Sequence, residues 1–132
     1  MANDKSAARP LSPHLQIYRP MLTMMMSIMH RITGVGLYFG IVLLVGWLMA
    51  AAMSETCFEF VQGFFGHWFG RLVLFGFTWT LIHHALGGLR HLLWDTGHGF
   101  DLNLVEWLAR ANLAGSIVLT LLLWVIGYGV MA

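Results

Sequence analysis

The chain has 132 residues, of which 58% are hydrophobic and only 10% are charged, and its formal net charge at pH 7 is +1. Soluble domains carry about 25% charged residues, so this composition indicates a protein whose solvent is the lipid bilayer. The small net charge gives no basis for nucleic-acid binding. The single cysteine, Cys57, excludes an internal disulfide and any multi-cysteine zinc or iron–sulfur site within the chain.

Residues 1–20 predict an irregular tail. All three prolines of the chain lie here, at Pro10, Pro13 and Pro20. Proline removes a backbone donor and fixes φ, which opposes a continuous helix. The segment is polar, so we expect no cleavable signal peptide. We expect this tail to lie along the membrane surface or to dock onto a partner.

Three apolar stretches predict an all-α membrane protein with a single membrane-anchor domain over residues 1–132. The predicted transmembrane helices cover residues 21–53, 71–94 and 107–128. The uncharged run from Ile32 to Ser54 has about the 20 residues that a bilayer requires. Because the first helix begins earlier, we expect it to overhang the membrane at its N-terminal end. Three helices of this kind are expected to form part of a heteromeric helix bundle.

The predicted connections differ in character. Residues 54–70 carry six phenylalanine and tryptophan side chains, a cluster typical of the membrane–water interface. Residues 95–106 contain three predicted helix breakers, Gly97, Gly99 and Asn103. The third predicted helix has no histidine, and we expect it to serve packing, with close contacts at Ala114, Gly115 and Ser116.

The basic residues predict the orientation of the chain in the membrane. Only Arg71 lies at the end where the first and second helices connect. The other six gather at the opposite end and are Lys5, Arg9, Arg19, Arg31, Arg90 and Arg110. Because basic residues are retained on the cytoplasmic side, we expect a cytoplasmic (or matrix) N-terminus and a C-terminus on the far side.

The stretch Leu81–Gly97 is the most informative part of the sequence, because it holds ionisable groups in an apolar segment. Such groups cost roughly 3 kcal/mol at a helix centre in the membrane. Helical spacing places His84, Gly88, His91 and Asp95 on one face. An imidazole offers a nitrogen lone pair, and a glycine one turn away leaves room for a flat ligand. We therefore predict that His84 is an axial ligand of a haem; the alternative is a buried histidine hydrogen-bonded to a neighbouring helix.

The first helix offers a second polar group near its start. Ser27 and Arg31 are four residues apart and so are neighbours, and His30 and Gly34 form another histidine–glycine pair. With His84 near mid-membrane, a bound haem could direct its propionates toward this basic end of the bundle. The alternative for His30 and Arg31 is an interfacial pair that reaches lipid headgroups.

Three stretches together resemble one protein family. They read Arg-Pro-Leu-Ser-Pro-His over 9–14, Ser-Ile-Met-His-Arg-Ile-Thr-Gly over 27–34, and His84 followed by Gly-Leu-Arg-His-Leu-Leu-Trp-Asp-Thr-Gly over 88–97. They resemble the cytochrome b subunit of succinate dehydrogenase, one of two small membrane anchors of respiratory complex II. The first motif is similar to the alphaproteobacterial and mitochondrial branch. Without a long presequence, the expected location is the bacterial inner membrane, with a cytoplasmic N-terminus and a periplasmic C-terminus.

The resemblance implies a role for each matching residue. His84 corresponds to the axial ligand of haem b, with the second histidine supplied by a partner anchor subunit. Ser27 and Arg31 correspond to residues lining the ubiquinone site. His30 and Arg31, and with them His91, correspond to residues near the haem propionates. The implied partners are a second small membrane-anchor subunit, an iron–sulfur subunit and a flavoprotein subunit.

Two positions remain open. His83 departs from the family, because some relatives carry tyrosine there. It lies about 100° round the helix from His84, so only one of the two can face a given haem. We expect His83 to pack or to hydrogen-bond. Asp95 is expected to cap the helix or to pair with a cation, with a role in proton or quinone chemistry as the alternative.

The expected function is that of a membrane-anchor subunit of succinate:ubiquinone oxidoreductase, which passes electrons from succinate oxidation to quinone. The chain has no dinucleotide fingerprint and no cysteine cluster, so we expect it not to oxidise succinate by itself. Two alternatives remain: the anchor of a quinol:fumarate reductase, and a structural membrane anchor without a cofactor.

Overall fold

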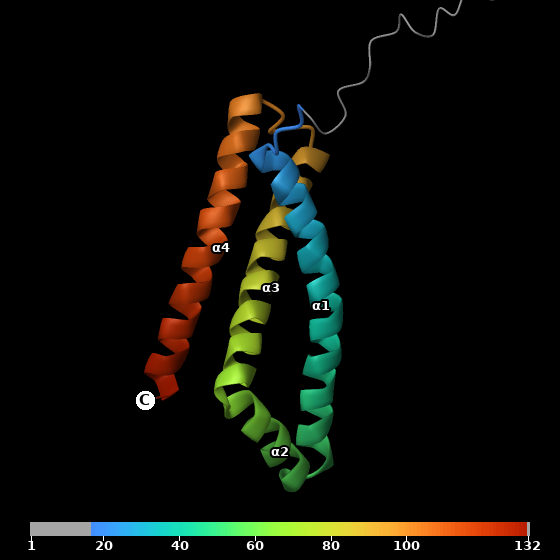
Figure 1. The fold of residues 1–132 in the computed structure, drawn as a ribbon, viewed down its shortest axis with the longest axis vertical. Coiled ribbons are helices and arrows are strands. Elements are labelled where there is room, and N and C mark those ends of the chain that lie inside the picture. Colours follow the sequence, from blue (N-terminus) through green and yellow to red (C-terminus); the bar gives the residue numbers. More distant parts are fainter. Residues whose placement is uncertain (1–16, 132) are drawn as a thin grey trace, which may run out of the picture.

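The computed structural model describes residues 17–131 and consists of four helices in the order α1 to α4 (Figure 1). Their bounds are α1 Leu22–Met53, α2 Glu55–Gly66, α3 Trp68–Asp95 and α4 Leu102–Met131. Within the described residues there is no strand, so the predicted all-α fold is confirmed. The part of the predicted tail up to residue 16, including the motif at 9–14, lies outside the described residues.

Three of the helices are long and apolar enough to cross a membrane, namely α1, α3 and α4. Helix α3 lies between α1 and α4, and the short helix α2 joins α1 to α3 at the opposite end from the N-terminus (Figure 1). Helix α1 has 32 residues, a length of about 48 Å against a hydrocarbon core of about 30 Å. The structure therefore gives α1 the length that the expected overhang requires.

The connection over residues 54–70 contains helix α2, which the sequence did not predict. The side chain of Ser54 accepts a hydrogen bond from the backbone N–H of Cys57 at 3.2 Å, and this cap starts the helix. Glu55 stands in the first turn, where the helix dipole favours a negative charge. The indole N–H of Trp47 on α1 donates to the Gln62 side chain at 3.1 Å and ties α2 to α1.

The ends of the long helices also differ from the predicted bounds. Helix α3 begins three residues earlier than predicted, where the His67 ring accepts from the backbone N–H of Phe69 at 3.4 Å. In the second connection, Gly97 and Gly99 have φ angles of +80° and +84°, which favour glycine. The breaker role predicted for Asn103 is wrong. Asp101 accepts from the backbone N–H of Asn103 at 3.0 Å, so α4 already includes this residue.

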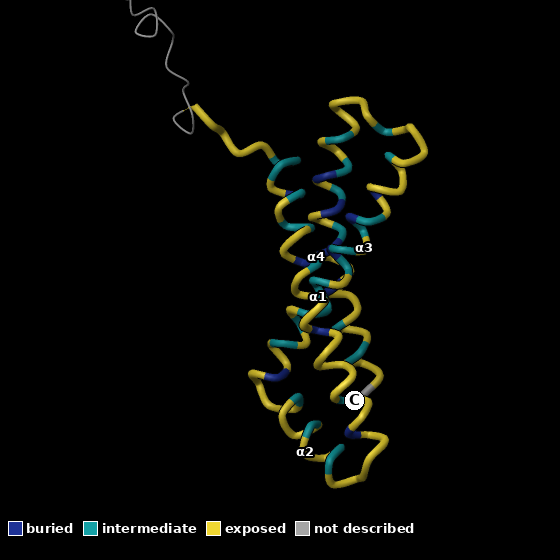
Figure 2. Tube along the Cα trace, turned by 90° about the vertical axis from the view of Figure 1, so that its right-hand side faces the viewer, coloured by how far each residue is buried: buried dark blue, intermediate teal, exposed yellow. Residues whose placement is uncertain are grey.

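Among the described residues, buried polar side chains outnumber buried hydrophobic ones. The buried hydrophobic residues are Met26, Ala50 and Ala109. The buried polar and charged residues are more numerous and are Thr33, His83, Arg90, Asn112, Ser116 and Thr120. Many large apolar residues are exposed, and exposed positions run along all of the helices (Figure 2). Of the three predicted contact points on α4, Ser116 is fully buried, Gly115 is half-buried and Ala114 is exposed.

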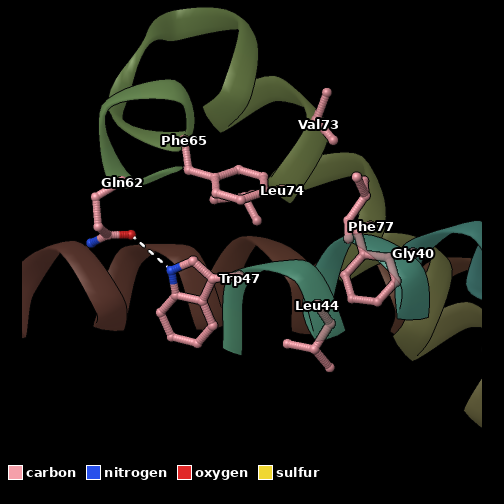
Figure 3. Close-up of a pocket in the computed structure, with 9 residues that line it drawn as sticks. Gly40, Leu44, Trp47, Gln62, Phe65, Val73, Leu74 and Phe77 are labelled. Atoms are coloured by element: carbon pink, nitrogen blue, oxygen red, sulfur yellow. Dashed lines mark hydrogen bonds between the residues drawn. The ribbon is translucent and has the colours of Figure 1, made fainter. Parts of the chain in front are cut away.

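A cavity lies between α1, α2 and α3 at the end of the bundle where α2 is found (Figure 3). It has a volume of about 300 Å³ and is lined mainly by apolar side chains, among them Leu44, Phe65 and Phe77. It contains none of the predicted site residues. Gly40 also borders this cavity, and a side chain there would overlap the ring of Phe77, so glycine permits the close approach of α1 and α3.

Gly70, near the start of α3, packs against the end of α2, and this contact predicts the effect of an alanine substitution. A Cβ at Gly70 would overlap the backbone of Phe64 and Phe65, whereas a Cβ at Gly76 would meet nothing within 4 Å. We expect Gly70→Ala to destabilise the protein by about 1–3 kcal/mol, because the backbone must shift. Thermal unfolding of the purified protein measures this effect.

The matched control is Gly76→Ala in the same helix. It should leave the midpoint temperature unchanged or raise it slightly, because alanine has the higher helix propensity. Equal changes in the two variants would contradict the assigned contact at Gly70.

Candidate functional site

His84 on α3 is held in one orientation by helix α1. Its Nδ1 lies 3.1 Å from the backbone oxygen of His30 and 3.2 Å from the hydroxyl oxygen of Thr33. A carbonyl oxygen can only accept, so Nδ1 is the donor and carries the ring proton. The lone pair of the neutral ring is then on Nε2. This is the arrangement that prepares a histidine to bind a metal through Nε2.

Nε2 is the ring nitrogen of His84 that remains without a partner among the described residues. It forms no hydrogen bond with residues 17–131, and it is not among the buried nitrogens that lack a partner there. The His84 side chain is half-buried. A glycine lies beside the ring, since a Cβ at Gly34 would stand 3.2 Å from its Cε1. Gly88, one turn along α3, has open space where a Cβ would be.

His30 lies flat against His84. The two ring centroids are 3.9 Å apart and the planes differ by 7°. Gly87 makes room for this stack, because a Cβ there would stand 2.5 Å from Nδ1 of His30. Thus two glycines on facing helices, Gly34 and Gly87, each leave space for a histidine of the other helix. The sequence paired His30 with Gly34 because they lie one turn apart on α1. In the structure, the space at Gly34 is occupied by the His84 ring.

Of the other predicted site residues, His91 contacts this pair. His91 is exposed, and its ring centroid is 5.1 Å from that of His30. Arg31 is also exposed, and Ser27 is half-buried. No hydrogen bond joins Ser27 to Arg31 within the described residues. The structure therefore brings together His84, His30 and His91, whereas Arg31 is exposed on α1.

His83 belongs to a different face of α3. It is fully buried, and its Nδ1 lies 3.3 Å from the hydroxyl oxygen of Ser116 on α4. Its ring also packs at 5.0 Å from that of Trp79. This agrees with the packing and hydrogen-bonding role expected for His83. Asp95 is exposed at the end of α3 and forms no ion pair with a described residue.

Sequence reasoning missed Thr33 and Asn112 near the site, and it did not indicate that Arg90 is buried. Thr33 contacts His84, and its hydroxyl also donates to the backbone oxygens of Met29 and His30, at 2.9 Å each. Arg90 and Asn112 are each only 6% exposed. Thr33 follows His30 by three residues, a helical spacing that could have indicated it. Nothing in the apolar sequence of α4 singled out Asn112 as an interior residue.

The donor set fits a haem better than a bare metal ion. No group of three or more histidine, cysteine, aspartate or glutamate side chains that could hold a metal ion occurs among the described residues. A porphyrin already fills the equatorial positions of its iron, so each axial position needs only one donor. His84 supplies one such donor, and the open space at Gly88 lies on the same face of α3.

Residues 5–123 match the family described as succinate dehydrogenase/fumarate reductase transmembrane subunit. The chain belongs to this family. It is 44% identical over 122 residues to the succinate dehydrogenase cytochrome b556 subunit of Paracoccus denitrificans, covering 92% of this chain and 94% of that one. The predicted resemblance is confirmed, and the chain is a transmembrane subunit of the succinate dehydrogenase/fumarate reductase type.

Relatives occur on both branches that the sequence indicated. The cytochrome b556 subunit of Rickettsia conorii is 36% identical over 117 residues, covering 89% of this chain and 91% of the relative. The mitochondrial cytochrome b560 subunit of Sus scrofa is 40% identical over 96 residues, covering 71% of this chain and 57% of the relative. Together with the three apolar helices, the family makes this chain a multi-pass membrane protein.

Proposed function

We propose that this family member is a membrane anchor of a succinate:ubiquinone oxidoreductase that carries one axial ligand of haem b and part of the ubiquinone site. The observation that supports this most directly is the hydrogen bond from Nδ1 of His84 to the His30 carbonyl, which leaves the lone pair of Nε2 available to a metal. The relatives named above are cytochrome b subunits of succinate dehydrogenase.

His84 is the proposed haem ligand, and contacts with α1 hold its ring in one orientation. The His30 carbonyl fixes the tautomer, and the stacked His30 ring limits rotation of the imidazole. An outer hydrogen bond of this kind also makes the ligand more basic. When bound, the haem supplies a one-electron redox centre. A second axial ligand would come from the partner anchor subunit, since His83 faces α4 and cannot reach the same position.

His30, Arg31 and His91 are the proposed neighbours of the haem propionates. His91 and Arg31 are exposed in this chain, so both can reach an anionic group at the bundle surface. Arginine binds carboxylates through paired N–H groups, which suits this role. The His30 ring contacts both other histidines, with centroid distances of 5.1 Å to His91 and 3.9 Å to His84.

Ser27 and Arg31 are the proposed ubiquinone residues. They lie one turn apart near the start of α1, at the end of the bundle that also holds Arg90 and Arg110. The Arg31 guanidinium would stabilise negative charge that develops on a quinone oxygen during reduction, and the Ser27 hydroxyl would donate to a quinone carbonyl. The iron–sulfur and flavoprotein subunits would dock at this same end and deliver the electrons from succinate.

Two alternatives are weaker. The family also includes fumarate reductase subunits, but the relatives reported above are named for succinate dehydrogenase. A structural anchor without a cofactor gives no role to His84, although ionisable residues within a membrane are costly and are usually functional.

Replacing His84 tests the haem assignment. We expect His84→Ala to lose the low-spin b-type spectrum of the purified complex, because the iron loses one axial nitrogen. Added imidazole, which fits the space left by the side chain, should restore part of that spectrum. Reduced-minus-oxidised optical spectra measure both effects.

The neighbouring histidine supplies the control. His83→Gln retains a hydrogen-bonding group beside Ser116 and should keep the low-spin spectrum. An unchanged spectrum in His84→Ala, or its loss in His83→Gln alone, would contradict the assignment.

Replacing Arg31 tests the quinone assignment. We expect Arg31→Leu to lower quinone reductase activity roughly 100-fold, the usual effect of removing one donor to a developing negative charge. Succinate oxidation with an artificial electron acceptor should persist, because that reaction does not use the quinone site.

The control is Arg110→Leu, an exposed arginine at the same end of the bundle that is paired with Glu106. It should leave both activities near the level of the unsubstituted complex. Equal loss of the two activities in Arg31→Leu would indicate failed assembly and not a quinone contact.

We further propose that the N-terminus faces the bacterial cytoplasm and the C-terminus the periplasm. The basic residues support this orientation. Cysteine labelling tests it in a Cys57→Ser background. A membrane-impermeant maleimide applied to intact cells should label Glu59→Cys on α2 but label His98→Cys, in the α3–α4 connection, only after permeabilisation. The reverse pattern would contradict the orientation.

A further inference from the structure

The seam where α1, α3 and α4 meet contains buried polar atoms that no described residue satisfies. Six such atoms belong to four side chains; they are Nδ1 of His30, Nε2 of His83, Nε and Nη1 of Arg90, and Nδ2 and Oδ1 of Asn112. Buried polar groups in native proteins nearly always have a partner, either protein or ordered water. Six unsatisfied atoms within one short stretch of the bundle therefore require a common explanation.

These side chains surround one place in the seam. His83, Gly87 and Arg90 follow one face of α3 at helical spacing. A Cβ at Gly87 would lie 2.5 Å from Nδ1 of His30 on α1 and 3.4 Å from Nδ2 of Asn112 on α4. Gly87 thus lets the His30 ring and the Asn112 amide approach α3 from the two neighbouring helices, although no described hydrogen bond joins these two side chains.

Arg90 has the strongest need for a partner. Its side chain is only 6% exposed, and its guanidinium carbon lies 5.1 Å from the centre of the Trp94 ring. Within residues 17–131 the only ion pair joins Arg110 to Glu106, so no described carboxylate neutralises Arg90. A buried cation without solvation is costly, and water is the partner that the interior of a polar seam can provide.

The unsatisfied atoms have the mixed character that water requires. The Ser116 hydroxyl donates to the Leu113 carbonyl at 2.9 Å, so its oxygen accepts from Nδ1 of His83. Nε2 of His83 is consequently an acceptor. Arg90 contributes only donors, while Asn112 contributes both a donor and an acceptor. A water molecule both donates and accepts, and internal waters typically form about three hydrogen bonds.

We propose that this seam binds a small cluster of internal water molecules, held by Arg90, Asn112, His30 and His83. The site is distinct from the Nε2 face of His84, because His83 faces α4 and Asn112 lies on α4. Its role is to solvate the Arg90 charge inside the membrane, so that a cation can stay beside the paired histidines.

Radiolytic labelling of the intact complex tests the proposal. A short X-ray pulse converts bound water to hydroxyl radical, and H2-18O identifies the oxygen source. His83 is the reporter, because its side chain is 0% exposed and only internal water can reach it. We expect His83 to be labelled in the unsubstituted complex and its labelling to fall about tenfold in Asn112→Leu, which removes two of the groups that hold the water.

Two further variants separate a lost water site from a folding defect. Asn103→Leu is the same substitution at an exposed position of α4 and should leave the labelling unchanged. Asn112→Ser replaces the amide with a hydroxyl group, which can still donate to and accept from water, and it should retain most of the labelling even if Asn112→Leu does not assemble.

A density map of the complex that shows individual waters provides the direct measurement. We expect water within hydrogen-bond distance of Nε of Arg90 and of the Asn112 amide. An unlabelled His83 in the unsubstituted complex, equal labelling in Asn112→Leu, or Arg90 paired with a carboxylate of another subunit or of a cofactor would overturn the proposal.

Discussion

The hydrogen bond between the His84 ring and the His30 carbonyl is the contact on which the site depends. It requires α1 and α3 to approach closely enough for a side chain of one helix to reach the backbone of the other. Gly34 permits this approach on α1, since a Cβ there would crowd the His84 ring at 3.2 Å. Gly87 permits it on α3 by making room for the His30 ring. The tautomer of His84 is thus a consequence of helix packing.

A membrane solvent explains why the interior of this bundle is polar. In water, the hydrophobic effect favours an apolar core. Lipid tails are as apolar as leucine, so in a membrane the hydrophobic effect does not drive helices together. The buried face of α4 accordingly consists of Ala109, Asn112, Ser116 and Thr120. The hydroxyl of Thr120 donates to the Ser116 carbonyl at 2.7 Å, which satisfies it within its own helix. Small and polar residues allow α3 and α4 to pack closely, while leucine and isoleucine face outward.

The sequence was sufficient to predict the three membrane helices, because length and hydropathy alone specify a transmembrane span. It also indicated His84 and the different role of His83, since consecutive residues on a helix point in different directions. It did not reveal α2, because the aromatic residues there were interpreted as an interfacial connection and the Ser54 cap was overlooked. The hydrogen bond from His84 to the His30 carbonyl could not be predicted either, because the residue pattern does not show which backbone carbonyl a side chain meets.

The interior position of Asn112 could not be predicted for another reason. Helix α4 is apolar around most of its circumference, so hydrophobic periodicity does not distinguish the face toward α3 from the face toward lipid. The same uncertainty applied to Arg90, which was expected near the basic surface and is instead 6% exposed beneath Trp94.

The adjacency of His83 and His84 also constrains how α3 can change during evolution. Each residue turns a helix by about 100°, so the deletion or insertion of one residue before this pair would move each histidine into the angular position of a neighbour. Substitutions along the outward surface of α3 leave the angular positions of the two histidines unchanged, whereas a change in helix length before the pair alters them. The number of residues between Gly70, where α3 packs against α2, and His84 is therefore expected to vary less among homologues than the identities of those residues.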